Sequence, residues 1–452
     1  MTSRLKVRGV AAPEPAPHRG PEHVVLEGEK GFRFVLRQPA FRLIWFAQLG
    51  SQIADKFLMF SLLILAYQVA GGSSQVAFTL LSYTIPAVFI APLAGVFADR
   101  HDRKLIMVYA NFLRAGLIAL IPLAALVPLL RHDFYHLLLI TFAISATGQV
   151  FTPSEAAAIP SVLPKRALLA ANSLVMVTLV LTLMVGGALA PILSGVDLYL
   201  PYWIGALLFT ASGLAILLAQ IPRLPAKFKA GERRHPFNQV WVELLEGVTT
   251  LRNSPVLMIG FAQLSTAVLV LLMMFTLAPA YVKTVLGISP QQTYVILVPA
   301  IVGAIISAAL LSRLVERWSQ TLLLFGTLIA MGATLVVLAG GQIITGRFPL
   351  IAGHTRIFGA ICAFVLGLEF GSLMIPALTY LMEHTSDVVR GRVFALLFMV
   401  INGVAVLPIV AAAVLADVFG ATWVIAVMGV LLVLPALAAL RFAPRAFAPA
   451  RT

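Results

Sequence analysis

Four charged residues, Asp55, Lys56, Arg114 and Glu369, lie deep within long apolar stretches of the sequence. A charge at the centre of a membrane-spanning helix costs roughly 2.5–3.5 kcal/mol on insertion scales, so such residues are functional candidates by default. Buried carboxylates can carry protons or bind cations, and a guanidinium stabilises a nearby ionised carboxylate. We therefore take Asp55, Arg114 and Glu369 as candidates for ion coupling or for lining a substrate cavity.

Asp55 has two interpretations. If Arg114 approaches it in one conformation and not in another, protonation of Asp55 becomes coupled to the conformational change. Alternatively, Asp55 forms a permanent ion pair with Arg114 or Lys56 that only compensates charge. Lys56 follows Asp55 in the predicted helix and therefore points about 100° away from it.

Glu369 lies between Gly367 and Gly371 in another apolar stretch, with no basic residue close to it in its own helix. It could bind a cationic substrate, carry a proton, or remain protonated as a hydrogen-bonded structural group. An adaptable apolar surface for varied substrates could be formed by flexible methionines and phenylalanines, namely Met273, Met274, Phe275, Met374 and Phe398. Such residues more often face lipid or the protein core.

The elements that must position these residues are membrane-spanning helices. Of the 452 residues, 60% are hydrophobic and 11% are charged, whereas a soluble domain carries roughly 25% charged residues. This composition excludes a soluble globular enzyme and a disordered protein. A spanning helix needs roughly 20 apolar residues, and the apolar runs lack the short alternating strands of a barrel. Twelve spans are predicted near residues 39–70, 75–98, 105–130, 134–160, 168–196, 200–221, 254–282, 290–312, 320–344, 354–382, 393–418 and 421–441.

The formal net charge of +14 would suggest nucleic-acid binding in a soluble protein. With the N-terminus placed inside, 25 of the 32 Lys and Arg residues fall in cytoplasmic segments, four fall outside and three lie within spans. Basic residues collect on the cytoplasmic side of membrane proteins. We therefore expect both termini to be cytoplasmic and expect no nucleic-acid partner.

Two six-helix halves are predicted, because Gly95–Arg100 and Ser312–Arg317 occupy equivalent positions after the second span of each half. Parallel six-helix repeats around a central site are a transporter architecture. Within the linker, the apolar spacing of residues 236–247 predicts an amphipathic helix that lies on the membrane surface or packs against the bundle ends. The predicted segments are a disordered cytoplasmic N-terminal tail (1–37), the N-terminal half (38–221), a cytoplasmic linker (222–253), the C-terminal half (254–441) and a cytoplasmic C-terminal tail (442–452).

The loop after the second span carries the most specific motif, with Gly95, Asp99, Arg100, Arg103 and Lys104 at fixed spacing. It resembles the loop 2–3 signature of the major facilitator superfamily. Asp102 stands where that family usually has glycine, and Asp tolerates a positive φ better than most residues. The resemblance implies a cytoplasmic gate in which Asp99 pairs with an arginine and with the N-terminus of a facing helix. The alternative is that the basic residues only anchor topology.

The fifth span contains Gly186, Gly187 and Pro191, which resembles the Gly/Pro-rich span 5 motif of exporters in the same superfamily. Ordinary close packing of small residues is the alternative. The run Pro153–Pro164 and the segment Arg390-Gly-Arg392 are similar to the subgroup that contains bacterial macrolide-efflux and enterobactin-exporter proteins. The resemblance covers about residues 39–441.

This resemblance implies an all-α, twelve-helix bundle in a bacterial cytoplasmic membrane that exports an amphipathic small molecule. The sequence has no Gly-rich loop for ATP and no helical pair of metal-ligating histidines, so we expect no enzymatic activity, cofactor or metal. Protons or another ion would supply the energy, lipid would surround the protein, and we expect a monomer. The alternatives are an importer or lysophospholipid flippase on the same scaffold, or a scaffold or sensor that does not transport.

Overall fold

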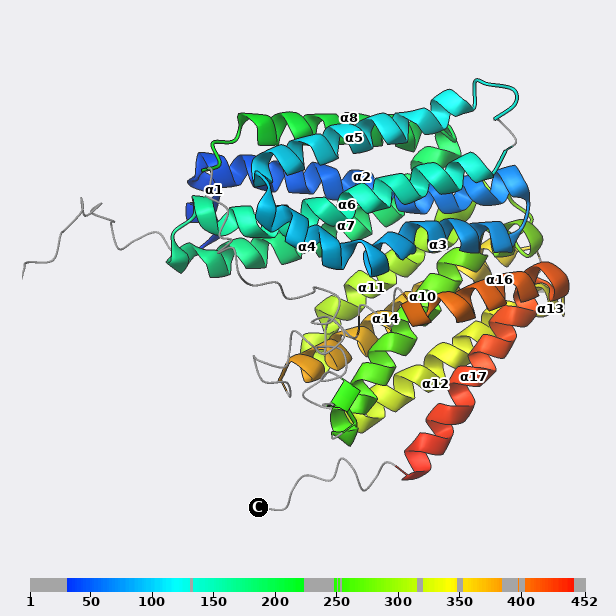
Figure 1. Cartoon of the computed structure of the whole chain (residues 1–452). Coiled ribbons are helices and arrows are strands. Elements are labelled where there is room, and N and C mark those ends of the chain that lie inside the picture. The colour runs from blue at the N-terminus through cyan, green and yellow to red at the C-terminus, as the bar shows by residue number, and fades with distance from the viewer. Residues whose placement is uncertain are drawn as a thin grey trace, which may run out of the picture.

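The structure is a computed structural model, and it describes residues 31–130, 133–222, 248–249, 251–252, 254–314, 320–347, 353–383, 397 and 403–442. Within these ranges the regular elements are helices, and no strand occurs (Figure 1). Only helices and closed barrels satisfy every backbone hydrogen bond inside a bilayer. The prediction of an all-α membrane protein is therefore confirmed.

The first half of the chain forms one bundle at the top of Figure 1. A short helix, α1, occupies Phe32–Arg37, where the sequence predicted a disordered tail, and it buries Val35 against the bundle. The second span is interrupted at Ile90, between two helices that each contain or begin near a proline. The helices of this half are α2 (Pro39–Ala70), α3 (Ser73–Phe89), α4 (Ala91–Arg100), α5 (Arg103–Ala124), α6 (Tyr135–Val162), α7 (Leu168–Val196) and α8 (Leu200–Leu218).

The second half forms the other bundle. Its helices are α10 (Pro255–Thr284), α11 (Tyr294–Leu314), α12 (Gln320–Ala339), α13 (Gly341–Arg347), α14 (Thr355–Glu383), α16 (Val406–Phe419) and α17 (Ala421–Phe442). The short 3-10 helix η2 (Pro290–Thr293) precedes α11. Eight described helices are long and apolar enough to cross a membrane, and a bent pair in the region of α12 and α13, with an angle of 63°, is a ninth. Together with the broken second span and the shorter α16 and α17, every one of the twelve predicted spans contains a described helix. The predicted amphipathic helix at 236–247 lies outside the described residues.

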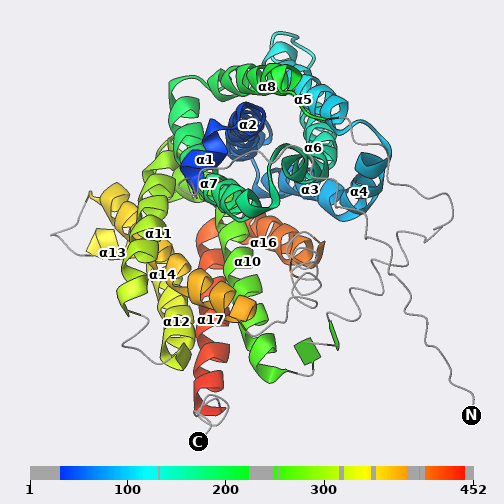
Figure 2. The same ribbon diagram turned by 90° about the vertical axis from the view of Figure 1, so that its left-hand side faces the viewer.

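The halves pack together at one end of the molecule. Contacts join α3 to α10 and α16, α7 to α11 and η2, and α2 to α10. Leu63 and Tyr67 of α2 and Leu80 of α3 belong to the same buried cluster as the core of the second half. From this end, which is opposite to α1 and the α4–α5 loop, the two bundles diverge (Figures 1 and 2). We call it the closed end.

Candidate functional site

Asp55 and Arg114 form an ion pair in the middle of the first half. Arg114 Nη1 donates to Asp55 Oδ1 at 3.3 Å and to Oδ2 at 3.1 Å. The partner of Asp55 is therefore Arg114, and no ion pair joins it to Lys56 among the described residues. A buried pair of this kind is costly to break from one side, because the remaining charge is left without compensation.

Arg114 is held on every side by its own half. Its Nη2 donates to Asn111 Oδ1 at 2.8 Å, and Ser51 Oγ donates to the same oxygen at 2.8 Å. The guanidinium carbon lies 4.9 Å from the ring centre of Phe151 on α6 and 4.5 Å from that of Phe209 on α8. Such cation–π contacts are strongest where water is excluded. Arg114 is thus a fixed cation, bound through four helices of one half.

The two members of the pair differ in their access to solvent. Arg114 exposes 1% of its side chain, whereas Asp55 exposes 26%. A proton can therefore reach the carboxylate without displacement of the guanidinium. This geometry places a partly accessible acid beside a buried, fixed positive charge.

Glu369 belongs to the second half and does not meet the Asp55–Arg114 pair. Thr334 Oγ1 on α12 donates to Glu369 Oε1 at 2.8 Å. The other oxygen, Oε2, is buried with no hydrogen-bond partner among the described residues. Its neighbours Gly367 and Phe370 line the cavity described next, but Glu369 is not one of the described lining residues. The structure leaves its three predicted roles open.

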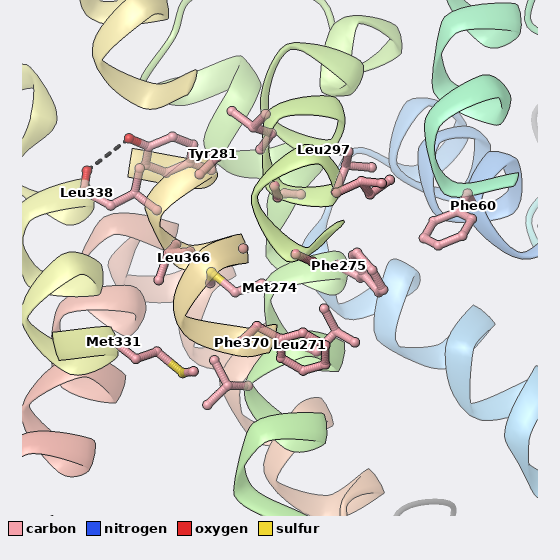
Figure 3. Close-up of a pocket in the computed structure, with 18 of the residues that line it drawn as sticks. Phe60, Leu271, Met274, Phe275, Tyr281, Leu297, Met331, Leu338, Leu366 and Phe370 are labelled. Atoms are coloured by element: carbon pink, nitrogen blue, oxygen red, sulfur yellow. Dashed lines mark hydrogen bonds between the residues drawn. The ribbon is translucent and has the colours of Figure 1, made fainter. Parts of the chain in front are cut away.

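An apolar cavity of about 190 Å³ lies mainly within the second half, and residues of α2 and α7 close one side of it (Figure 3). The rings of Phe60 and Phe275 meet edge to face across the two halves, with centroids 5.0 Å apart. Among its described lining residues, the one hydroxyl belongs to Tyr281, which donates to the Leu338 carbonyl oxygen at 2.9 Å. Such a cavity excludes charged groups and accepts apolar ones.

The methionines and phenylalanines that were predicted to form one binding surface do not all lie together in the structure. Met274 and Phe275 line the cavity. Met273 and Met374 pack instead against the core of the second half. Phe398 lies outside the described residues.

The α4–α5 loop is tied to its own half. Asp102 has φ −64°, not a positive φ, and its side chain accepts hydrogen bonds from the Lys104 and Leu105 amides, so it caps the N-terminus of α5. Arg103 Nη1 donates to the Ala157 carbonyl on α6 at 3.0 Å. Gly95, Asp99 and Arg100 lie within α4, but the arrangement of their side chains is outside what the structure describes. The predicted gate stays a prediction.

The small residues of the fifth span bring α7 against its neighbours. A Cβ added at Gly186 would overlap the Cβ of Lys56, and one at Gly187 would lie 3.1 Å from the Phe60 ring. Pro191 lies inside α7 without ending it. The structure therefore assigns these glycines a packing role between α2 and α7.

At the closed end, a carboxylate joins the two halves. Asp417, near the C-terminus of α16, accepts hydrogen bonds from the backbone amides of Ser73 at 2.6 Å and Ser74 at 2.9 Å, at the N-terminus of α3. Close by, the Lys283 ammonium on α10 lies 5.5 Å from the ring centre of Tyr67 on α2. We call the contact of Asp417 with Ser73 and Ser74 the latch.

Sequence reasoning missed Asp417, Thr334 and the residues around Arg114. Asn111, Phe151 and Phe209 have types that are ordinary in a membrane bundle, and only the fold brings them to one guanidinium. A signal for the latch does exist in the sequence: Gly71 and Gly72 open a turn directly before the serines of α3. Among the described residues, no group of three His, Cys, Asp or Glu could hold a metal ion.

Comparison with known proteins relates this chain to a family and to proteins of similar sequence. The sequence profile of the Major Facilitator Superfamily matches residues 44–353. The chain is 24% identical over 393 residues to the uncharacterized MFS-type transporter YfiS of Bacillus subtilis (strain 168), covering 86% of this chain and 89% of that protein. It is 23% identical over 386 residues to macrolide efflux protein A of Streptococcus pyogenes, covering 84% and 90% of the two chains.

Solved structures agree on the fold. The nucleoside transporter NupG superposes with a TM-score of 0.65 at 12% identity, covering 89% of this chain and 98% of that one. A bacterial homologue of the iron transporter ferroportin, in an inward-facing state, gives a TM-score of 0.65 at 16% identity and covers 91% and 100% of the two chains. At these identities the likeness establishes the architecture alone.

Proposed function

Because the chain belongs to the major facilitator superfamily, a family of membrane transporters, we propose that it exports an amphipathic small molecule in exchange for protons by alternating access. The observation that carries this proposal is the partly accessible Asp55 bound to the fixed, buried Arg114, in a chain that also has an apolar cavity lined by residues of both halves. The likeness to macrolide efflux protein A supports export rather than import.

The proposed orientation follows from the distribution of basic residues. If 25 of the 32 Lys and Arg residues face the cytoplasm, then α1 and the α4–α5 loop are cytoplasmic and the closed end is external. The divergence of the bundles then corresponds to an inward-facing state in a bacterial cytoplasmic membrane, with both termini inside. Substrate would enter from the cytoplasm or the inner leaflet, and the protein would act as a monomer.

Asp55 is the proposed coupling acid. In the inward-facing state it would release its proton to the cytoplasm and remain ionised against Arg114. Protonation from the outside would weaken that pair and favour the return. Glu369 is the proposed second acid, since one of its oxygens is buried without a partner among the described residues. A membrane potential of 100 mV supplies about 2.3 kcal/mol for each elementary charge that moves across the membrane.

Transport in inside-out vesicles tests this proposal. Vesicles energised with a proton gradient should accumulate a substrate from a panel that includes a labelled macrolide and a labelled catecholate siderophore, and a protonophore should abolish the accumulation. Asp55→Asn and Glu369→Gln should reduce gradient-driven accumulation. Asp197→Asn is the matched control, because the Asp197 carboxylate accepts a hydrogen bond from the Tyr199 amide within the first half, beside α8.

Three outcomes would contradict the proposal. Unchanged, pH-dependent transport in both Asp55→Asn and Glu369→Gln would remove the coupling assignment. Accumulation only in right-side-out vesicles would favour an importer. Movement of no substrate class, or of lysophospholipid alone, would favour the scaffold or flippase alternatives.

A further inference from the structure

Lys56 is a charged residue in the middle of α2 that takes no part in the Asp55–Arg114 ion pair. It is half-buried. Asp55 is a nearby negative charge, but among the described residues no hydrogen bond or ion pair joins a partner to the Lys56 ammonium. Asp55 is its neighbour in sequence but is bound to Arg114 on another face of α2. A cation without a directly bound partner is costly inside a membrane protein and normally has one. That partner is not supplied by the described part of the chain.

The position of Lys56 is fixed by the packing of α7 against α2. Three hydrogen bonds join the two helices in parallel register: Trp45 to Thr178 at 2.9 Å, Thr182 to Gln52 at 2.9 Å, and Ser194 to Ser61 at 3.2 Å. Between the second and third of these, Gly186 makes room for the Lys56 side chain.

Lys56 therefore lies on the face of α2 that leads to the apolar cavity. Phe60 is one helical turn further along α2, on the same face, and it lines the cavity (Figure 3). Leu183 and Met184, which also line it, lie between Thr182 and Gly186 on α7. Lys56 itself is not one of the described lining residues, but it lies one turn from Phe60 and packs against α7 next to Leu183 and Met184. None of the described lining residues carries a charge.

We propose that the substrate is an amphipathic organic anion whose carboxylate binds the Lys56 ammonium while its apolar body fills the cavity between α2 and α11. This inference rests on the proposed transport function and narrows it to a charge class. Glu369 does not compete with the substrate carboxylate for the Lys56 ammonium, because it lies on α14 beside Thr334 of α12. A neutral or cationic molecule of the same shape would leave Lys56 uncompensated, so the site discriminates by charge.

Binding of a matched pair of probes to the purified full-length protein tests the proposal. 1-Naphthaleneacetate and 1-naphthaleneacetamide have the same ring, nearly equal volume and different charge. The wild-type protein should bind the acid at least tenfold more tightly than the amide, since hydrogen bonds to charged groups are the stronger ones. Lys56→Met should remove this preference, Lys56→Arg should keep most of it, and Lys165→Met, which removes an exposed lysine next to α7, should leave it intact.

Several results would overturn the proposal. They are equal affinity of the wild-type protein for acid and amide, binding of neither, or an acid preference that survives in Lys56→Met. Should Lys56→Met fail to fold, the wild-type and Lys56→Arg measurements still decide. Stabilisation by lysophosphatidylglycerol and not by naphthaleneacetate would also contradict it, in favour of a lipid. Because these are binding measurements, acid-selective binding without transport would defeat the proposed function alone, and proton-driven transport unaffected by Lys56→Met would defeat this inference alone.

Discussion

The latch at the closed end gives a prediction that tests alternating access directly. Asp417 contributes a carboxylate from the second half, and Ser73 and Ser74 contribute two backbone amides from the first. Opening of the closed end must break both hydrogen bonds. Asp417→Asn should therefore shift the equilibrium between the two states toward the one that is open at this end.

The magnitude follows from the two contacts. A hydrogen bond to a charged group contributes roughly 1.5–3 kcal/mol, and the loss of a negative charge at a helix N-terminus costs roughly 0.3–1 kcal/mol. Asparagine keeps one acceptor oxygen, so we expect a loss of about 1–2 kcal/mol, which is roughly a 5- to 30-fold change in the ratio of the states. A form populated at about 1% would rise to roughly 5–20%.

Gly72→Ala perturbs the same latch without a change of charge. A Cβ on Gly72 would overlap Gln75 Oε1, which must move aside, and would lie 3.0 Å from Asp417 Oδ2, so the carboxylate must shift by a few tenths of an ångström and its hydrogen bonds to the amides weaken. Asp197→Asn is the control, since it removes a similar carboxylate–amide bond that lies within one half. The latch predicts a shift for Asp417→Asn and Gly72→Ala and none for the control.

Pulsed electron resonance between spin labels measures the shift. Labels at Leu129→Cys and Ile343→Cys, in a chain whose buried Cys362 has been replaced, would report the distance between the halves, because both positions are strongly exposed and follow helices that end at the closed end. A longer distance should gain population in Asp417→Asn. A distance distribution identical to that of the wild-type protein, in a folded Asp417→Asn variant, would refute the role of the latch.

Two further predictions concern the first half. Asp55→Asn should lower the free energy of unfolding in detergent by roughly 3–5 kcal/mol, because it leaves the buried Arg114 charge alone. Arg114→Gln should cost less, because the Asp55 carboxylate that it leaves is partly exposed. The double variant should lose less than the sum of the two; additive losses would mean that the pair is not coupled. Gly186→Val should destabilise the protein, because the valine side chain would overlap Lys56. Gly116→Val on α5 is the control and should be tolerated, because a Cβ there meets nothing within 4 Å. Equal thermal unfolding temperatures of the two valine variants would contradict the close approach of α2 and α7.

The fold followed from composition and hydropathy because a bilayer leaves helices as the solution for uniformly apolar runs. Asp55, Arg114 and Glu369 stood out because a charge is rare in such a run. Their partners could not be predicted in the same way. Asp55 had two candidate cations, and the choice of Arg114 depends on the packing of both α2 and α5 against α8 and on the rings of Phe151 and Phe209.

The conformation of local turns was harder to predict from the sequence than the partners of the charged residues. Asp102 was considered for its tolerance of positive φ, but it caps α5 from an extended conformation. Its carboxylate satisfies the amides of Lys104 and Leu105, which glycine in the same position could not do. The identity of a loop residue therefore did not reveal which backbone groups needed a partner.

The second and eleventh spans carry acids at opposite ends of the same helix pair. Asp417, near the C-terminus of α16, binds the N-terminus of α3 at the closed end. Asp99, near the C-terminus of α4, is the acid that the family signature assigns to a gate at the other end. Each carboxylate can then stabilise one state at the expense of the other, since a helix N-terminus favours a negative charge that reaches it. On this reasoning the two substitutions, Asp417→Asn and Asp99→Asn, should shift the label distances in opposite directions. Shifts of the same sign would show that the two ends do not act as alternatives.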